Sequence, residues 1–270
     1  INKAKITDIK INNKNLRYKI DHSFSKYLIN EKILNISRRS KYLIFYFKKR
    51  LLMVHLGMSG KLLLIRNDDK KIFKTSFYYD TNVIPKHNHI FFKLDNGYAL
   101  VYNDVRRFGF FKIYNTKHFS KITFLNKLGL EPFSKKLDLK YFKHFIRKKK
   151  KNIKNLLMDQ SFICGLGNIY VNEVLFLSEI NPTKSCVKLN DNEIKGLLLN
   201  IKKILRFAIS KGGSSLRDFQ NASGKKGYFQ EYFRVYGKIN KKCSRISCKG
   251  KIRKIVISNR STFYCSHCQF

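Results

Sequence analysis

Four cysteines near the C-terminal end of the chain have the types and spacing of a metal site. Four residues separate Cys243 from Cys248, sixteen follow, and two separate Cys265 from Cys268. Two close cysteine pairs at this separation suit one tetrahedral zinc ion, with each pair forming a knuckle whose thiolates converge on the metal. Two disulfides in a secreted tail are the alternative. The spacing favours one structural zinc.

The sequence between the cysteine pairs predicts how this site is built. Residues 251–257 and 262–264 are rich in β-branched and aromatic residues, and Asn259-Arg260-Ser261 lies between them. This pattern is typical of two short strands about a turn. We expect a zinc ribbon with the basic residue Arg260 at its tip.

Two further stretches have chemistry that suits phosphate. Gly165-Leu166-Gly167 precedes a predicted helix, and such a turn presents free backbone N–H groups to an anion. The same pattern also occurs as a plain tight connection. Residues 147–151 are all basic and indicate a phosphate-binding patch, in which any neighbour could replace Lys149.

The charge balance points to a polyanionic partner. The chain contains 57 Lys and Arg but only 17 Asp and Glu, for a formal net charge of +40, and its pI is about 10.1. Part of this charge reflects a composition rich in Lys, Asn and Ile, as AT-rich genomes produce. The hydrophobic content of 43% excludes wholesale disorder.

The hydropathy pattern and the cysteine content indicate a cytoplasmic protein. No apolar stretch approaches the roughly 20 residues that cross a bilayer, so no membrane partner is expected. We find no secretory signal, and Cys164 and Cys186 are most simply reduced, buried thiols. The compartment we expect is therefore a reducing cytoplasm.

The elements that position these residues predict an α+β protein. Residues 42–47 and 51–56 flank Lys48-Lys49-Arg50, and residues 89–94 and 98–102 flank Asp95-Asn96-Gly97, which are hairpin patterns. Regularly spaced strands of this kind suggest a sandwich or barrel. We divide the chain into a β domain, a linker, a helical domain and the ribbon, at residues 1–114, 115–137, 138–233 and 234–270.

The helical domain is predicted from apolar periodicity. Leu139, Phe142 and Ile146 share one face, and a clean i, i+3, i+4 stripe runs from Ile194 to Ala208. Asn190 and Glu193 form a plausible capping box for the stripe, and Gly212-Gly213 ends that helix. Residues 152–160 and 168–178 predict two more helices.

Taken together, these stretches resemble the formamidopyrimidine-DNA glycosylases, bacterial enzymes that excise oxidised purines. The resemblance rests on six motifs in matching order and on the ribbon, and it covers essentially the whole chain. The motifs are Arg38-Arg39-Ser40-Lys41-Tyr42-Leu43, His55-Leu-Gly-Met-Ser-Gly60, Lys86-His87-Asn88-His89, Asp104-Val-Arg-Arg-Phe-Gly109, Gly165-Leu-Gly-Asn-Ile-Tyr170 and Lys211-Gly212-Gly213. It implies an N-terminal β-sandwich, a helix–two-turn–helix domain and a C-terminal zinc finger.

The resemblance also implies residues that act on DNA after a damaged nucleotide is turned out of the stack. Flipping costs a few kcal/mol and leaves a gap in the duplex. Met58, Arg106 and Phe108 match the family's void-filling trio, namely a flexible apolar chain, a guanidinium for the orphaned base and an aromatic wedge. Without the motifs, Met58 and Phe108 would be interpreted as core residues on strands.

Catalytic and phosphate-contacting roles follow from the same resemblance. Lys41 matches the lysine assigned to proton transfer in β-elimination, and Arg260 matches the finger arginine that grips phosphates and assists δ-elimination. His87, Lys149 and Asn168 match positions that contact DNA. For His87 the alternative is a structural histidine at a strand start. Residues 212–228 resemble a loop that closes over the extruded base.

The chain departs from the family pattern most clearly at its beginning. The family's nucleophile is an N-terminal proline followed by glutamate, whose amine attacks C1′, whereas the first proline here is Pro85 and Ile1 aligns roughly twenty residues into the pattern. We therefore expect that a segment with Pro-Glu is missing from this sequence. A shortened protein that binds DNA without cutting it is the alternative.

Two smaller departures concern the turn residues. The first knuckle has four intervening residues where the family usually has two, which still suits zinc. Val105 stands where a proline usually precedes the arginine pair, and we expect a looser turn before Arg106.

The function predicted is that of a monomeric, nucleoid-associated glycosylase and AP lyase with one zinc ion. It would remove 8-oxoguanine and formamidopyrimidines from double-stranded DNA and nick the strand at abasic sites by β,δ-elimination. The alternatives are an endonuclease VIII-type enzyme for oxidised pyrimidines and a non-catalytic DNA-binding zinc protein.

Overall fold

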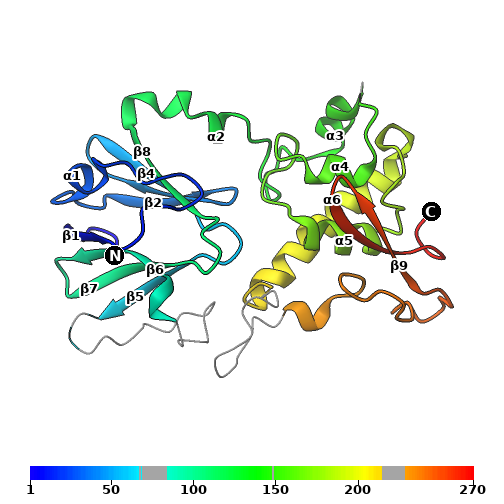
Figure 1. Ribbon diagram of the computed structural model, residues 1–270. Helices are drawn as coiled ribbons and strands as arrows, with labels where there is room; N and C mark the ends of the chain where they lie inside the picture. Colours follow the sequence, from blue (N-terminus) through cyan, green and yellow to red (C-terminus); the bar gives the residue numbers. More distant parts are fainter. Residues whose placement is uncertain (67, 69–83, 148, 215–228) are drawn as a thin grey trace. The chain divides into compact units, whose positions relative to one another are not determined.

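The chain folds into two compact units, which Figure 1 shows in a computed structural model that describes residues 1–66, 68, 84–147, 149–214 and 229–270. The first unit contains Ile1–Asn126, and the second contains Lys127–Ser214 with the described residues of Gly227–Phe270. The finer domain boundaries given above stay predictions.

The first unit is built around two antiparallel four-stranded sheets. One sheet has the order β1 (Ile6–Ile11), β6 (Asn88–Leu94), β7 (Tyr98–Asn103) and β5 (Lys61–Arg66). The other has the order β2 (Asn35–Arg39), β3 (Tyr42–Tyr46), β4 (Arg50–His55) and β8 (Phe110–Asn115). The short helix α1 (Phe24–Leu28) lies between β1 and β2 in the chain.

Buried side chains from both sheets form one core, so the predicted sandwich is confirmed. Ile90 and Phe92 of β6 belong to the same hydrophobic cluster as Leu52 and Val54 of β4. Burial of this apolar surface is the main force that holds the two sheets face to face. Both predicted hairpins are present, since β3 pairs with β4 and β6 pairs with β7.

The hairpin turns have the backbone that the sequence demands. Gly97 has a φ of +82° in the turn between β6 and β7, a conformation that glycine adopts without strain. Ser40 has a φ of +54° in the turn between β2 and β3, and this turn places Lys41 at the end of the hairpin.

Short helices connect the first unit to the second in the chain. They are η2 (Thr116–Lys121) and α2 (Thr123–Asn126), and another single turn, η1 (Pro85–His87), precedes β6. Asn115 caps η2 by accepting a hydrogen bond from the Lys117 N–H at 2.9 Å.

The second unit is helical and ends in a β-ribbon. Its elements are α3 (Leu139–Ile146), α4 (Ile153–Met158), α5 (Asn168–Leu177), η3 (Cys186–Lys188), α6 (Asp191–Ser210), η5 (Phe229–Tyr232), β9 (Ile252–Ile257) and β10 (Arg260–Cys265). The predicted helices and the two ribbon strands are therefore confirmed. Asn190 and Glu193 form the predicted capping box of α6.

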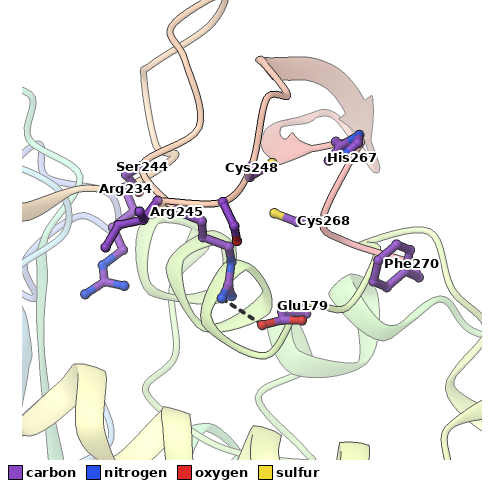
Figure 2. Close-up of a pocket in the computed structure, with 10 residues that line it drawn as sticks. Glu179, Arg234, Ser244, Arg245, Cys248, His267, Cys268 and Phe270 are labelled. Carbon is purple, nitrogen blue, oxygen red and sulfur yellow. Dashed lines mark ion pairs between the residues drawn. The ribbon is translucent and has the colours of Figure 1, made fainter.

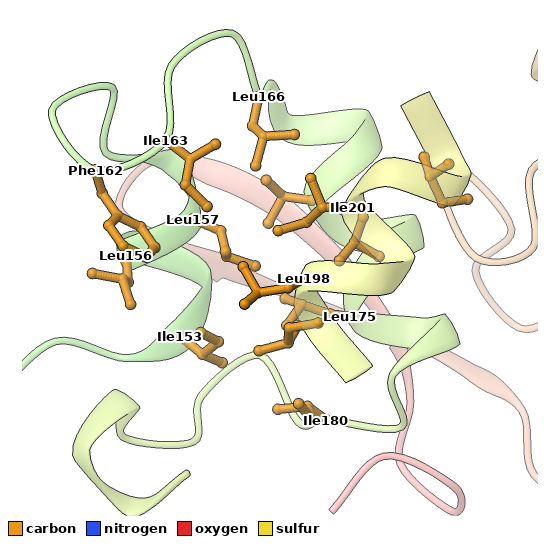
Figure 3. Packing of buried hydrophobic residues seen from close by; sticks show 14 of the residues in the cluster. Ile153, Leu156, Leu157, Phe162, Ile163, Leu166, Leu175, Ile180, Leu198 and Ile201 are labelled. Atoms are coloured by element: carbon orange, nitrogen blue, oxygen red, sulfur yellow. The ribbon is translucent and has the colours of Figure 1, made fainter. Parts of the chain in front are cut away.

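A single apolar core joins the helices of this unit. Figure 3 shows Leu157 of α4, Leu175 of α5 and Leu198 of α6 turned toward one another, all members of one buried cluster. α5 is apolar nearly all round, and the residues Val171 to Phe176 are buried. α5 is consequently the central element on which the ribbon also packs, because Phe176 shares a second cluster with Ile252 and Phe263.

Two further predictions concern the lesion loop and the membrane. The loop predicted to close over an extruded base lies, from residue 215 to 228, outside the described residues. Among the described residues no helix is both long and apolar enough to span a membrane.

Candidate nucleic-acid interface and metal centre

The four ribbon cysteines converge as their spacing predicts. Their sulfur atoms all lie within 4.8 Å of one another, with 3.7 Å between Cys243 and Cys268 and 3.6 Å between Cys248 and Cys265. Zn–S bonds of about 2.3 Å in a tetrahedron place the sulfurs about 3.8 Å apart. The thiolates therefore fit one zinc ion, and the disulfide alternative is wrong because the cysteines are unpaired and the sulfurs are too far apart.

A glycine makes room for this centre. A Cβ atom on Gly250 would lie 2.8 Å from the Cys265 sulfur and 2.6 Å from the Cβ of His267. The Gly250 N–H also donates a hydrogen bond of 3.4 Å to the Cys248 sulfur, so residue 250 contacts two of the four ligands. Any larger residue at position 250 would push the two knuckles apart.

The longer first knuckle has a structural use. Figure 2 shows Arg245 extending from the knuckle to Glu179, with 2.7 Å between the charged atoms. The Arg245 guanidinium also donates to the carbonyl oxygen of Phe176 at 2.8 Å, at the C-terminal end of α5. The extra residues thus tie the metal centre to the helix end, where a cation is favoured.

A buried carboxylate ties the start of the finger to the same helix. Glu173 of α5 accepts hydrogen bonds from three consecutive backbone N–H groups, those of Arg234 at 2.8 Å, Val235 at 3.0 Å and Tyr236 at 2.9 Å. Burial raises the pKa of Glu173, and the three N–H groups act in the opposite direction. Removal of the Glu173 side chain would take the hydrogen-bond acceptor away from all three backbone N–H groups.

Side chains from α4 and α5 hold the ribbon tip that contains Arg260. The Asn168 amide donates to the Ser261 carbonyl at 2.9 Å, and the Phe263 N–H donates to the Asn172 side chain at 2.6 Å. Lys154 is 1% exposed and donates to the Ser261 carbonyl and to the Thr262 hydroxyl. The tip is therefore positioned by the helical core.

The charge of Lys154 lies close to that of Arg260. Burial, and to a smaller extent the positive charge of Arg260, lower the pKa of Lys154 to about 8. An anion bound at the tip would relieve this repulsion. The helices and the ribbon thus bring Lys154, Asn168 and Arg260 together into one cationic site, which we call the finger-tip site.

Lys149 has a different environment. It follows α3, and its ammonium lies 4.3 Å from the centre of the Phe145 ring, a cation–π arrangement. Within the described part of the chain, we find no hydrogen bond or ion pair that joins Lys149 to Asn168 or Arg260. Its DNA contact stays a prediction.

In the first unit, Lys41 lies near the partly buried His55. Lys41 is exposed at the hairpin end, and its charge contributes to the low pKa of His55, which burial lowers to about 4. The neutral His55 ring accepts a hydrogen bond from the Gly57 N–H at 2.9 Å through Nδ1 and stacks on Phe110 at 5.5 Å. Nδ1 is therefore the acceptor, and Nε2 is the protonated nitrogen.

The three residues of the predicted void-filling trio lie on two loops that touch. Met58 is 52% exposed and Phe108 43% exposed, so the core interpretation of both is wrong. The Arg106 guanidinium lies 4.7 Å from the centre of the Phe108 ring. A Cβ atom on Gly57 would lie 2.6 Å from the Phe108 carbonyl carbon, so residues 57–60 and residues 104–109 are in direct backbone contact.

His87 joins the same region from η1. Its carbonyl oxygen accepts a hydrogen bond of 3.0 Å from the Asp104 N–H, at the start of the Arg106 loop. Partial burial lowers the pKa of His87, and the charge of Lys86 adds to this effect. The first unit therefore gathers Met58, His87, Arg106 and Phe108 around Asp104.

Several residues that build these sites were not predicted from the sequence. Lys154 stands one helical turn before Leu157, on the apolar face of α4, and Glu173 interrupts the apolar run of α5. A charged residue on a buried face is a detectable signal, because such a residue needs a partner. The partners themselves lie far away in sequence, at Ser261 and at residues 234–236.

Comparison with protein families assigns three parts of the chain. Residues 1–111 match the formamidopyrimidine-DNA glycosylase N-terminal domain, and residues 128–220 match the H2TH domain of the same enzymes. Residues 240–269 match a zinc finger found in FPG and IleRS.

Individual proteins agree with these assignments. The formamidopyrimidine-DNA glycosylase of Rickettsia conorii is 43% identical over 266 residues, 98% of this chain and 92% of the relative, and that of Bartonella tribocorum is 40% identical over 277 residues, 98% and 93%. A crystal structure of a Lactococcus lactis FPG mutant in complex with a Fapy-dG containing DNA has a TM-score of 0.82 and 35% identity, covering 100% of this chain and 93% of that one. The Lactococcus lactis enzyme non-covalently bound to an AP site containing DNA gives a TM-score of 0.81 with the same identity and coverage.

Proposed function

The chain belongs to the formamidopyrimidine-DNA glycosylase family, and from this premise we propose how its residues carry out the activity of that family. The protein is a base-excision-repair DNA glycosylase and AP lyase with one structural zinc ion. Its substrate is double-stranded DNA that contains formamidopyrimidine, 8-oxoguanine or an abasic site. Excision leaves an abasic site, and β,δ-elimination then nicks the strand.

The exposure of Met58, Arg106 and Phe108 on two touching loops is the observation that carries this proposal. Single exposed apolar side chains are common on protein surfaces, whereas several that lie together on touching loops mark an interaction site. Here they stand beside a guanidinium, which suits a site that enters the base stack from the side. Met58 and Phe108 would fill the space of the extruded nucleotide, and Arg106 would donate hydrogen bonds to the base left behind.

Lys41 and Arg260 carry the chemical roles in this proposal. Lys41, an exposed residue at the hairpin end, transfers a proton during β-elimination at the abasic sugar. Arg260 binds the phosphates near the lesion and stabilises the leaving phosphate in δ-elimination. Asn168 acts with Arg260 at the finger-tip site. His87 of the first unit and Lys149 of the second unit contact the DNA backbone.

The zinc ion has no direct part in this chemistry. Cys243, Cys248, Cys265 and Cys268 hold it, and when bound it fixes the fold of the ribbon. The ribbon in turn presents Arg260. The next two residues, Ser261 and Thr262, accept hydrogen bonds from Lys154. We place this activity in the cytoplasm, at the nucleoid. The active protein is a monomer, and its three domains comprise residues 1–114, 138–233 and 234–270.

A panel of damaged duplexes tests the proposal. Protein expressed from the complete gene should excise 8-oxoguanine and formamidopyrimidine faster than thymine glycol. A faster reaction on thymine glycol would assign it instead to the endonuclease VIII type. Borohydride should trap a covalent adduct on an abasic duplex, and failure to trap any adduct would leave a DNA-binding protein without lyase activity.

A further inference from the structure

One buried carboxyl group connects the segments of the first unit that hold Met58, His87, Arg106 and Phe108. Asp104 follows β7 and is 0% exposed. Its backbone already joins two segments, because its N–H donates to the His87 carbonyl at 3.0 Å and its carbonyl lies 2.7 Å from Nε2 of the buried His89. Asp104 therefore anchors residues 87–89 before its side chain is considered.

The side chain of Asp104 accepts four hydrogen bonds from three different segments. Oδ1 accepts from the Ser59 hydroxyl and from the Arg106 N–H at 3.2 Å. Oδ2 accepts from the Tyr102 hydroxyl at 2.7 Å and from the Gly109 N–H at 3.0 Å. The Ser59 oxygen also accepts from the Arg106 N–H at 3.1 Å, so the Met58 loop and the Arg106 loop share one polar centre.

The two loops approach Tyr102 so closely that side chains larger than glycine would not fit at positions 60 and 109. A Cβ atom on Gly109 would lie 1.8 Å from the Tyr102 hydroxyl, and one on Gly60 would lie 2.8 Å from the same atom. Both glycines therefore let the loops approach Tyr102 and the carboxylate. Burial and the hydrogen bond to Asp104 raise the pKa of Tyr102, so its hydroxyl keeps the proton that it donates.

We propose that Asp104 is a positioning residue that holds the Met58 loop and the Arg106 loop as one rigid wedge for lesion recognition. The inference rests on the proposed function of Met58, Arg106 and Phe108. A buried charge with four donors fixes geometry because each donor that leaves it exposes an unsatisfied group. The wedge enters the duplex already assembled, and no part of the binding energy goes into ordering the loops.

The variant Asp104→Asn tests the proposal, since it keeps the shape of the side chain but replaces one carboxyl oxygen acceptor by an NH₂ donor. The matched control is Asp95→Asn, in the turn between β6 and β7, where Asp95 accepts from the exposed Lys5 N–H at 2.9 Å. We would measure Kd for a duplex with a tetrahydrofuran abasic-site analogue and for the undamaged duplex. Asp104→Asn should lower the ratio of the two affinities roughly tenfold, and the control should leave it unchanged.

A double-mutant cycle gives a readout that a merely structural role would not move. With Asp104 in place, Met58→Ala and Phe108→Ala should be non-additive in their effect on lesion affinity, because the two side chains act as a unit. In the Asp104→Asn background their effects should become additive. If Asp104→Asn fails to fold, Ser59→Ala removes a single donor and should give a smaller loss of the same ratio.

The outcomes separate this inference from the function on which it rests. If the unaltered protein shows no preference for the analogue, the proposed function fails. If it shows the preference, and Asp104→Asn and Ser59→Ala both keep it or weaken both duplexes equally, the positioning role of Asp104 is wrong.

Discussion

The two units solve the same problem, the placement of a few exposed side chains, by different means. In the first unit a buried aspartate accepts hydrogen bonds from two loops and from Tyr102 of β7. In the second unit four thiolates and a buried glutamate fix a small ribbon that has little core of its own. Small domains need such constraints because they bury too little apolar surface. Only one of the two sites should therefore depend on metal.

Loss of the zinc ion should have the largest effect and should be confined to the second unit. Cys265→Ser removes a fully buried ligand, and structural zinc contributes on the order of 10 kcal/mol to the fold of such fingers. We expect the affinity for any duplex to fall on the order of 100-fold, because Arg260 and the finger-tip site are lost together. Filter binding and zinc analysis would measure both quantities.

The control for this experiment is Cys164→Ser, which alters a buried thiol outside the finger. It should keep one zinc ion per chain. Hydrogen exchange of the β4 and β7 amides should be the same in both variants. Increased exchange in these strands of Cys265→Ser would mean that the sandwich also depends on the metal.

Removal of the Glu173 carboxylate should have the next largest effect. Glu173→Ala leaves the N–H groups of residues 234–236 without their acceptor, which we expect to destabilise the attachment of the finger by about 3 kcal/mol. Hydrogen exchange at these three amides would report the change. Glu231→Ala, an exposed carboxylate in the preceding turn, is the matched control, and equal exchange in both variants would contradict the role of Glu173.

Local sequence patterns predicted the regular elements of both units but not these anchors. Cysteine spacing, hairpin turns and helical periodicity are local signals, and they located the zinc site, two hairpins of the sandwich, the ribbon strands and helix α6 correctly. The contacts of Asp104 with Ser59 and of Lys154 with Ser261 join residues 45 and 107 positions apart. Such pairs depend on tertiary packing, which no local pattern contains.

The turn before Arg106 shows the same limit. A looser turn was expected because Val105 stands where the family usually has proline. In the structure the Arg106 N–H is held by both the Asp104 carboxylate and the Ser59 hydroxyl. A hydrogen-bonded turn of this kind needs no proline, and the serine that completes it is too distant in the chain for a local pattern to reveal.

Acid should weaken the first unit through His55. Its pKa is about 4 in the folded protein and 6.5 in the unfolded chain, so the unfolded state takes up a proton first as the pH falls. The stability contributed by neutral His55 is present above pH 6.5 and is lost between pH 6.5 and 4, by about 1 kcal/mol after allowance for solvent screening. Denaturant unfolding of His55→Gln and of the unaltered protein at pH 7 and pH 5 would isolate this contribution, and an equal loss in both would contradict it.

Base should strengthen the second unit through Lys154. Its pKa is about 8 when folded and 10.5 when unfolded, so between these values the unfolded state binds the extra proton and stability rises with pH. We expect a gain on the order of 1 kcal/mol from pH 8 to pH 9.5, due mainly to burial of the Lys154 ammonium and less to the charge of Arg260. Lys154→Met should abolish the gain, and a gain that persists in this variant would assign it to another group.

The most direct test of the division between the two units is the salt dependence of binding to lesion-containing and undamaged duplexes. Arg260→Ala should weaken both complexes equally and reduce the slope of log K against log salt by about 1. Met58→Ala with Phe108→Ala should weaken only the lesion complex and leave the slope unchanged. Loss of lesion preference in Arg260→Ala, or equal weakening of both duplexes in the Met58 and Phe108 variant, would contradict the account.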